Sequence, residues 1–187
     1  MSLLEIKKFG CPTLKEEASE IGAVDEDVQT LIDRMFATMY AAEGIGLAAP
    51  QVGVSQRLLV LDVRPSDPSR TAMALINPKI VEATGEIVGE EGCLSMPGVV
   101  GDVKRASDIG VEAIDREGTP VTIVASGIEA RALQHEIDHL DGVLVIERFS
   151  TIRRNLLRSQ LRKIRKEGSR QAPVPVQIEA ALTESSS

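Results

Sequence analysis

The sequence predicts an α+β fold in which antiparallel or mixed β-sheets surround a central helix, with one more helix near the C-terminus. Three observations predict it. Apolar residues recur at helical spacing in three separate segments, and strand-like apolar runs cluster between the first and second of them. The regular strand–helix alternation of a parallel sheet is absent. The expected order is therefore helix, several strands, helix, strand, helix.

Length and composition indicate one globular domain. A chain of 187 residues is close to the length of a single domain, which we place at 1–167 and follow with a flexible tail at 168–187. Hydrophobic residues make up 43 % and charged residues 26 %, as in ordinary globular proteins. No apolar run reaches the ~18 residues of a membrane span. The N-terminus lacks the apolar stretch of a signal peptide, so we expect a cytoplasmic protein without a membrane partner.

The first half of the chain holds one helix and most of the strands. Asp25 is placed to cap a helix that runs to about Glu43, with Gly44 as its expected stop. Its apolar residues follow helical spacing: Val28, Leu31, Ile32, Met35, Phe36 and Met39. Strands are expected over 57–63 and over 72–83, the second interrupted by Asn77-Pro78. A hairpin is expected over 110–126 with its turn at 115–118.

The second half holds the other two helices. Ser126 and Glu129 have the spacing of a capping box at the start of a helix that Gly142 ends. A strand is expected after Gly142, and a last amphipathic helix over 150–167. The apolar side of the last helix is formed by Ile152, Leu156, Leu157, Leu161 and Ile164.

The two histidines of the chain carry the strongest chemical indication. His135 and His139 lie four residues apart in a predicted helix, so both imidazoles share one face and can bind one metal ion. Glu136 completes a His-Glu-Ile-Asp-His sequence, in which the glutamate is the typical general base of a metallohydrolase. The alternative is a pair of histidines on a solvated helix face, which leaves the glutamate unexplained.

A catalytic site of this type needs a third protein ligand and an open position for water. The arrangement with a third histidine is excluded, because Val145 stands where that histidine belongs. The glutamates further along the chain are poorly placed: Glu147, Glu167, Glu179 and Glu184. Cys93 is the best remaining ligand, whereas Cys11 is more simply an inert small residue.

Three segments together resemble the peptide deformylase family. They are Gly44-Ile-Gly-Leu-Ala-Ala-Pro-Gln51, Glu91-Gly-Cys-Leu-Ser95 and Gln134-His-Glu-Ile-Asp-His139, in the order in which the family has them. The resemblance extends over roughly residues 3–165. It implies removal of the formyl group from the N-terminal formyl-methionine of new polypeptides, with release of formate.

The resemblance also implies one divalent metal per chain, held by Cys93, His135 and His139. The family uses iron(II) natively, and zinc, nickel or cobalt can occupy the site in purified protein. Imidazole and thiolate ligands suit both iron and zinc, so the sequence does not choose between them.

The family's pattern assigns roles to further residues. Glu136 is implied as general base and then acid, and the Gln51 side chain with the Leu94 backbone N–H as donors to the oxyanion. The substrate peptide is expected to pair as an added strand along Ile45, Gly46 and Gly92. The methionine pocket is expected to draw on Ile128, Ala132 and His135. Arg131 has two interpretations, a residue near the mouth of this pocket or, more simply, an exposed helix residue.

The uneven charge distribution along the chain indicates which macromolecules the protein can bind. Residues 150–167 hold seven basic residues and one acid, a net charge of +6, whereas residues 1–149 carry −12. The acidic body and the 2 % aromatic content argue against sequence-specific nucleic-acid binding. In the family a basic C-terminal helix can dock on the ribosome, so ribosome contact through 150–167 is expected as an accessory function.

Two other functions stay open: a metallopeptidase with a different third ligand, and a binding protein with a structural metal.

Overall fold

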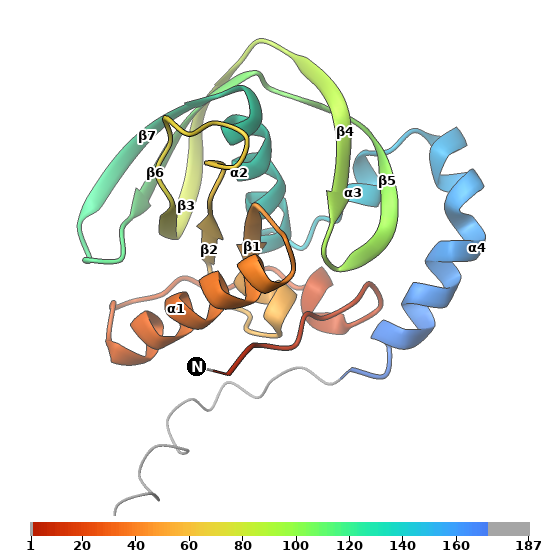
Figure 1. Cartoon of the computed structure of the whole chain (residues 1–187), viewed down its shortest axis with the longest axis horizontal. Helices are drawn as coiled ribbons and strands as arrows, with labels where there is room; N and C mark the ends of the chain where they lie inside the picture. Colours follow the sequence, from red (N-terminus) through yellow and green to blue (C-terminus); the bar gives the residue numbers. More distant parts are fainter. Residues whose placement is uncertain (1, 172–187) are drawn as a thin grey trace, which may run out of the picture.

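Two antiparallel sheets lie on either side of one helix. The structure is a computed structural model that describes residues 2–171, so residues 172–187 of the expected tail lie outside the described part (Figure 1). The larger sheet has the strand order β1-β2-β3-β6-β7. Its strands are β1 (Gly46–Ala48), β2 (Leu58–Leu61), β3 (Met73–Thr84), β6 (Asp108–Ile114) and β7 (Pro120–Ser126). The smaller sheet is the hairpin of β4 (Ile87–Cys93) and β5 (Met96–Arg105).

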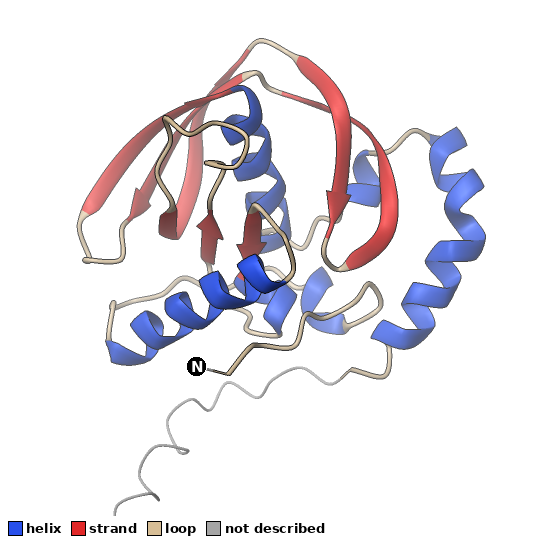
Figure 2. Ribbon diagram, in the orientation of Figure 1, coloured by secondary structure: helices blue, strands red, loops and turns tan. Residues whose placement is uncertain are grey.

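The helices cover both sheets. They are α1 (Glu26–Ala41), α2 (Gly127–Leu140), α3 (Val145–Arg148) and α4 (Thr151–Gly168), with 3-10 turns at Pro12–Lys15 and Ala49–Val52. Figure 2 shows α2 between the two sheets and α4 beside β5 at the edge of the molecule. All strand pairs among these elements are antiparallel, which confirms the predicted α+β class. None of the helices in residues 2–171 combines the length and apolar character needed to cross a bilayer.

The central helix is anchored by the main core. Leu133, Ile137 and Leu140 of α2 pack with Leu59, Leu61 and other buried residues of the larger sheet. Burial of a side chain of this size stabilises a fold by roughly 1.5–3 kcal/mol, so this core fixes the rotation of α2 about its axis. The opposite face of α2 is thereby turned toward β4.

The start of α1 is as predicted and its end is not. The Asp25 carboxylate accepts a hydrogen bond from the Val28 N–H at 2.9 Å. The left-handed residue at the C-terminus is Glu43, with φ +55°, rather than Gly44. The N–H groups of Glu43 and Gly44 bond to the carbonyls of Tyr40 and Met39, the pattern of a Schellman motif. Gly44 is required for another reason, since a β-carbon there would lie 2.8 Å from the Leu94 side chain.

The predicted capping box at α2 does not form. Ser126 is the N-cap residue, but its side chain makes no capping hydrogen bond. Arg70, from the loop before β3, takes both members of the expected box: its guanidinium lies 3.0 Å from the Glu129 carboxylate and donates to the Ser126 hydroxyl at 3.3 Å. A long-range ion pair has replaced the expected local hydrogen bonds to the backbone.

The segment after Gly142 contains no strand. Residues 145–148 form the one-turn helix α3 instead, and Val145 is buried against β5, α4 and the N-terminal segment. Short apolar runs do not distinguish a strand from a buried helical turn, which is the reason for the error.

Helix α4 presents less of its apolar side to the core than predicted. Leu157 and Ile164 are buried and Leu161 packs against them, but Ile152 and Leu156 are 75 % and 74 % exposed. The helix ends at Gly168, where a β-carbon would overlap the carbonyl groups of Lys8 and Phe9. The side chain of Gln171 accepts a hydrogen bond from the Lys8 N–H at 2.6 Å.

The hairpin β4–β5 is the element that sequence reasoning missed. Its strands carry acids and glycines where a half-buried strand usually alternates apolar and polar residues, as Gly89-Glu90-Glu91-Gly92 shows. The hairpin nevertheless positions Cys93, at its turn, against α2.

Candidate active site

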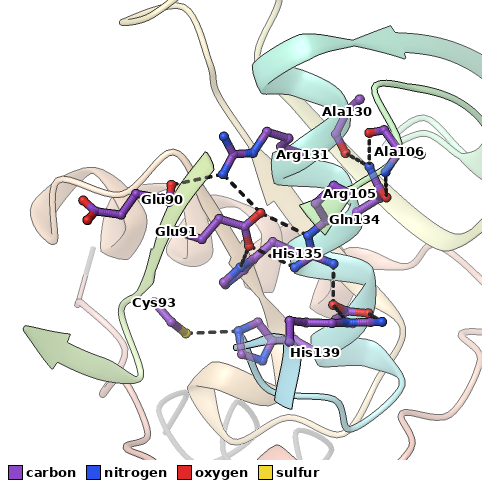
Figure 3. Close-up of polar contacts among 12 residues, drawn as sticks. Glu90, Glu91, Cys93, Arg105, Ala106, Ala130, Arg131, Gln134, His135 and His139 are labelled. Atoms are coloured by element: carbon purple, nitrogen blue, oxygen red, sulfur yellow. Dashed lines mark hydrogen bonds and ion pairs between the residues drawn. The ribbon is translucent and has the colours of Figure 1, made fainter. Parts of the chain in front are cut away.

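The three predicted metal ligands meet between the two sheets. Cys93 comes from the end of β4, and His135 and His139 come from successive turns of α2 (Figure 3). One ligand atom from each residue lies within 4.8 Å of the other two, and Cys93 Sγ is 3.2 Å from His139 Nε2. Residues 42 and more positions apart in sequence are therefore brought to one point.

This donor set fits a divalent transition metal. One thiolate and two imidazoles are the ligand types that bind zinc and iron, and three protein ligands leave a position for water. Burial opposes ionisation of Cys93, but the adjacent His139 and His135 hold the pKa of its thiol well below the usual value. The thiolate form that a metal requires is thus favoured by the neighbouring imidazoles.

His135 is oriented by an acidic residue that sequence reasoning missed. The Nδ1 of His135 donates to a carboxylate oxygen of Glu91 at 3.2 Å, which leaves Nε2 as the free ligand atom. Glu91 and Cys93 are two residues apart in one strand, so their side chains share a face. This two-residue spacing from Cys93 is the feature of the sequence that could have identified Glu91 as part of the site. Glu91 accepts two hydrogen bonds from Arg105, at 3.0 and 3.1 Å.

A chain of ion pairs continues from Arg105 through Asp138 of α2 to Arg148 of α3. Arg105 donates to Asp138 at 2.6 Å, and Asp138 also accepts from Arg148. Burial acts against the charge of Glu91, but the hydrogen bonds from His135 and Arg105 lower its pKa to about 2. The acid that holds His135 therefore stays ionised across the physiological pH range.

Glu136 lies in the same space without a fixed partner. Its side chain is buried, and its Oε2 has no hydrogen-bond partner within residues 2–171. Burial raises the pKa of Glu136 above that of an ordinary glutamate. A carboxyl group with a raised pKa and an unpaired oxygen suits a general base that takes and returns a proton.

The Gln51 side chain directs its amide nitrogen toward the metal ligand Cys93. The Ala48 N–H donates to Gln51 Oε1 at 2.8 Å, which turns Nε2 toward Cys93 Sγ at 3.5 Å and Ser95 Oγ at 3.4 Å. Leu94 lies in the turn between β4 and β5, next to Cys93. The structure thus brings Gln51, Leu94 and Glu136 to the borders of one cavity.

That cavity has a volume of about 480 Å³ and is lined by every residue predicted to bind substrate. Ile45, Gly46 and Gly92 lie along its length, and Ile128 and Ala132 lie on the α2 side. The residues that sequence reasoning missed are Glu43, Glu90, Glu91, Pro97 and Gly98. The expectation of an exposed Arg131 is wrong, because its side chain is 15 % exposed and lines the cavity.

Comparison with known proteins gives one consistent result. The profile of the family described as "Polypeptide deformylase" matches residues 3–155. A peptide deformylase of Thermodesulfovibrio yellowstonii is 49 % identical over 162 residues, which cover 87 % of this chain and 98 % of that protein. The crystal structure of a peptide deformylase from Legionella pneumophila superimposes with a TM-score of 0.81 at 41 % identity, covering 91 % of this chain and 99 % of that one. A second, from Synechococcus elongatus in complex with actinonin, gives a TM-score of 0.76 at 39 % identity, covering 88 % and 86 %.

Proposed function

This chain belongs to the peptide deformylase family, as a metallohydrolase that removes the N-formyl group from new polypeptides, and from this premise we propose how its residues divide the reaction. The single observation that carries the proposal is the meeting of Cys93, His135 and His139 beside Glu136 on one cavity.

Cys93, His135 and His139 would hold one divalent metal, with Glu91 fixing the ring of His135. A bound metal of this kind lowers the pKa of water toward neutrality and so supplies the nucleophile for amide hydrolysis. We propose iron(II) as the native ion. Its test is the lifetime of activity in air, which should be shorter for the iron form than for the nickel form, because iron(II) and the adjacent thiolate are both oxidisable. Equal lifetimes would remove the case for iron.

Glu136 moves the proton. Its unpaired Oε2 takes the proton from the attacking water and delivers it to the amine as the formamide C–N bond breaks. The raised pKa supports the first half of this exchange, because it makes the carboxylate a stronger base toward the proton of water. The second half follows because the leaving amine is more basic than the carboxylate and takes the proton from it.

Gln51 and Leu94 bind the oxygen of the formyl group as it gains negative charge. Gln51 Nε2 is held in place by the Ala48–Gln51 hydrogen bond before substrate arrives, so its donation costs no reorganisation. The Leu94 backbone N–H is the second donor, placed by the turn that also places Cys93.

The substrate lies along the cavity. Its backbone pairs with Ile45 and Gly46 on one side and Gly92 on the other, as an added strand between β1 and β4. The side chain of the formylated residue enters the part of the cavity lined by Ile128, Ala132 and His135.

The experiment that tests these roles is formate release from formyl-Met-Ala by protein reconstituted with iron without oxygen. Glu136→Gln should retain metal and lose most turnover, because all three ligands remain and proton transfer is removed. Glu112→Gln, an exposed residue of β6, is the matched control and should behave as the parent. Near-normal formate release by Glu136→Gln would refute the assigned role.

A deformylase and a metallopeptidase with another third ligand predict different metal contents for Cys93→Ala. Loss of bound metal in that variant supports the thiolate ligand, whereas retention of metal supports the peptidase. Activity on formyl-Met peptides separates either enzyme from a protein with a purely structural metal.

We also propose cytoplasmic action on nascent formyl-methionyl chains, with ribosome contact through α4. Arg158, Arg162 and Lys166 are exposed on this helix, whereas residues 1–149 carry −12 and repel RNA. Replacing these three residues by Gln should leave cleavage of formyl-Met-Ala at the parental rate and reduce sedimentation with ribosomes at low salt. Unchanged sedimentation would mean that the basic residues are only a solvated helix face.

A further inference from the structure

An ion-pair network leads from the metal site to a half-exposed residue of α3. Asp138 lies between two arginines: Arg105 donates to it at 2.6 Å, and Arg148 donates to both of its oxygens at 2.6 and 3.1 Å. Arg105 also donates twice to Glu91, at 3.0 and 3.1 Å, and Glu91 accepts from His135 Nδ1 at 3.2 Å (Figure 3). From Arg148 to Glu91 the charges alternate in sign at every step.

The inner part of this ion-pair network is shielded from water. The side chains of Arg105, Glu91 and Asp138 are 3 %, 9 % and 10 % exposed, whereas that of Arg148 is 46 % exposed. Charges at buried positions are screened much less than charges on the surface. A change of charge at the half-exposed end is therefore felt by the buried members, while the substitution itself removes little packing.

The ion-pair network also joins two separate cavities. Glu91 and His135 line the substrate cavity, whereas Arg105, Asp138 and Arg148 line a second cavity of about 550 Å³. Among the residues that the structure describes, none lines both cavities. Arg148 does not border the substrate cavity, so an effect of its substitution on the metal site has to come through the residues between them.

We propose that Asp138 and Arg148 are positioning residues for the metal ligand His135, and that their charges act on it in opposite directions. The inference rests on the proposed roles of His135 as a ligand and of Glu91 as the residue that orients it. Arg105 divides its hydrogen bonds between Asp138 and Glu91. The more strongly Asp138 holds Arg105, the less Arg105 neutralises Glu91, and the stronger Glu91 becomes as an acceptor for the Nδ1 proton. A stronger acceptor raises the donor strength of His135 toward the metal.

The alternation of charge sets the direction of each effect. Without the Arg148 guanidinium, Asp138 keeps Arg105 and holds it more tightly, so the metal should bind more tightly. Without the Asp138 charge, Arg105 is drawn to Glu91, so the metal should bind more weakly. A network that served only as a scaffold would loosen in both cases, and the metal would bind more weakly in both.

The test measures zinc affinity by competition with a chelator of known affinity, read as bound metal. Arg148→Met should raise the affinity roughly threefold or more, and Asp138→Asn should lower it by at least as much, as is typical of residues along such networks. Arg148→Lys keeps the charge but not the two parallel donors, so its affinity should lie between those of Arg148→Met and the parent. Weaker binding in both Arg148→Met and Asp138→Asn, or parental affinity in Arg148→Met, overturns the inference.

Two controls separate the hydrogen-bonded network from the general effect of charge. Lys104 lines the same cavity as Arg148 and is 67 % exposed, but it pairs with Glu86, so Lys104→Met should leave the zinc affinity within about twofold of the parental value. Glu91→Gln interrupts the network, so adding Arg148→Met to it should change the affinity by less than about twofold. An equal rise in Lys104→Met, or a full effect of Arg148→Met in the Glu91→Gln background, would overturn the inference in favour of charge acting at a distance.

The proposed function fails by different results. It is overturned if Cys93→Ala retains zinc or if the iron-loaded parent releases no formate from formyl-Met-Ala, and the inference then falls with it. If both results are as expected and Arg148→Met does not raise the zinc affinity, the inference alone is overturned. Arg148→Met decides this by itself if the buried change Asp138→Asn prevents folding, because Arg148 is half-exposed.

Discussion

Gly46 lies against the carboxyl group of Glu136, so closely that a β-carbon at position 46 would overlap the Glu136 side chain. The two residues come from β1 and α2, which pack together in the core. Glycine at this position is therefore required by the Glu136 side chain, the proposed general base, as well as by the proposed approach of a substrate backbone. The position of Glu136 depends on a residue that performs no chemistry.

Gly46→Ala should lower kcat by about 10²-fold, because a displacement of about 1 Å in a reacting group has an effect of that size. Glu136 must move away from the added methyl group, while the three metal ligands keep their places. Gly22→Ala is the matched control, since a β-carbon at Gly22 meets no other atom within 4 Å. Parental kcat in Gly46→Ala, measured by formate release, would show that Glu136 tolerates the displacement.

Gln51→Ala should lower kcat and kcat/KM together, since a donor to the oxyanion acts mainly in the transition state. Loss of one such donor reduces the rate by roughly 10²–10³-fold. Gln51→Glu is the sharper variant, because it preserves the acceptor for the Ala48 N–H and removes the donor. A rise in KM alone would make Gln51 a residue that positions substrate.

Glu91→Gln should weaken metal binding by roughly 10–100-fold, because the carboxylate that orients His135 is replaced by a neutral amide. The neighbouring Glu90 is exposed, so Glu90→Gln is the matched control. The measurement is competition with a chelator of known affinity, read by bound metal and not by turnover. Equal affinities in the two variants would remove Glu91 from the metal site.

Asp62→Asn should destabilise the protein at neutral pH by roughly 1–3 kcal/mol, since the buried carboxylate accepts hydrogen bonds from Arg64 and Tyr40. The hydrogen bonds from Arg64, opposed by burial and joined by that from Tyr40, hold the pKa of Asp62 well below its usual value. A lowered pKa stabilises the folded state above the unfolded-state pKa of about 4, and this contribution is lost as the pH falls through the folded-state value.

Urea unfolding at several pH values checks this. The difference in the free energy of unfolding between parent and Asp62→Asn should be full at pH 7 and at pH 5.5, and should shrink below about pH 4. A difference that is constant down to pH 3 would mean that Asp62 contributes by shape and not by charge.

The parts of the fold that sequence predicted are those with local causes. Asp25 caps α1 through a bond to a residue three positions away, and the hairpin β6–β7 turns where its Asp-Arg-Glu-Gly sequence predicts. Where a distant residue intervenes, local reasoning was wrong. Arg70 takes the partners of the capping box, and the packing of Leu94 explains Gly44.

The candidate site also has residues with local sequence signals and residues whose role depends on distant contacts. The spacing of His135 and His139 on one helix indicated a shared metal from local geometry alone. Glu91 was missed because its importance depends on a hairpin with an atypical composition. Arg131 was misjudged because an arginine between apolar helix residues is usually solvated, whereas here Glu90 and Glu91 draw it inward.

The hairpin β4–β5 and the helix α2 belong to separate structural layers, and each contributes to the metal site. An ion bound there would join the two layers as a cross-link, because Cys93 is on one layer and both histidines are on the other. A ligand that binds only the folded arrangement stabilises it by mass action. Removal of the metal should therefore raise the rate of amide hydrogen exchange in 87–105 more than in β6–β7, and the hairpin should open before the rest of the domain unfolds.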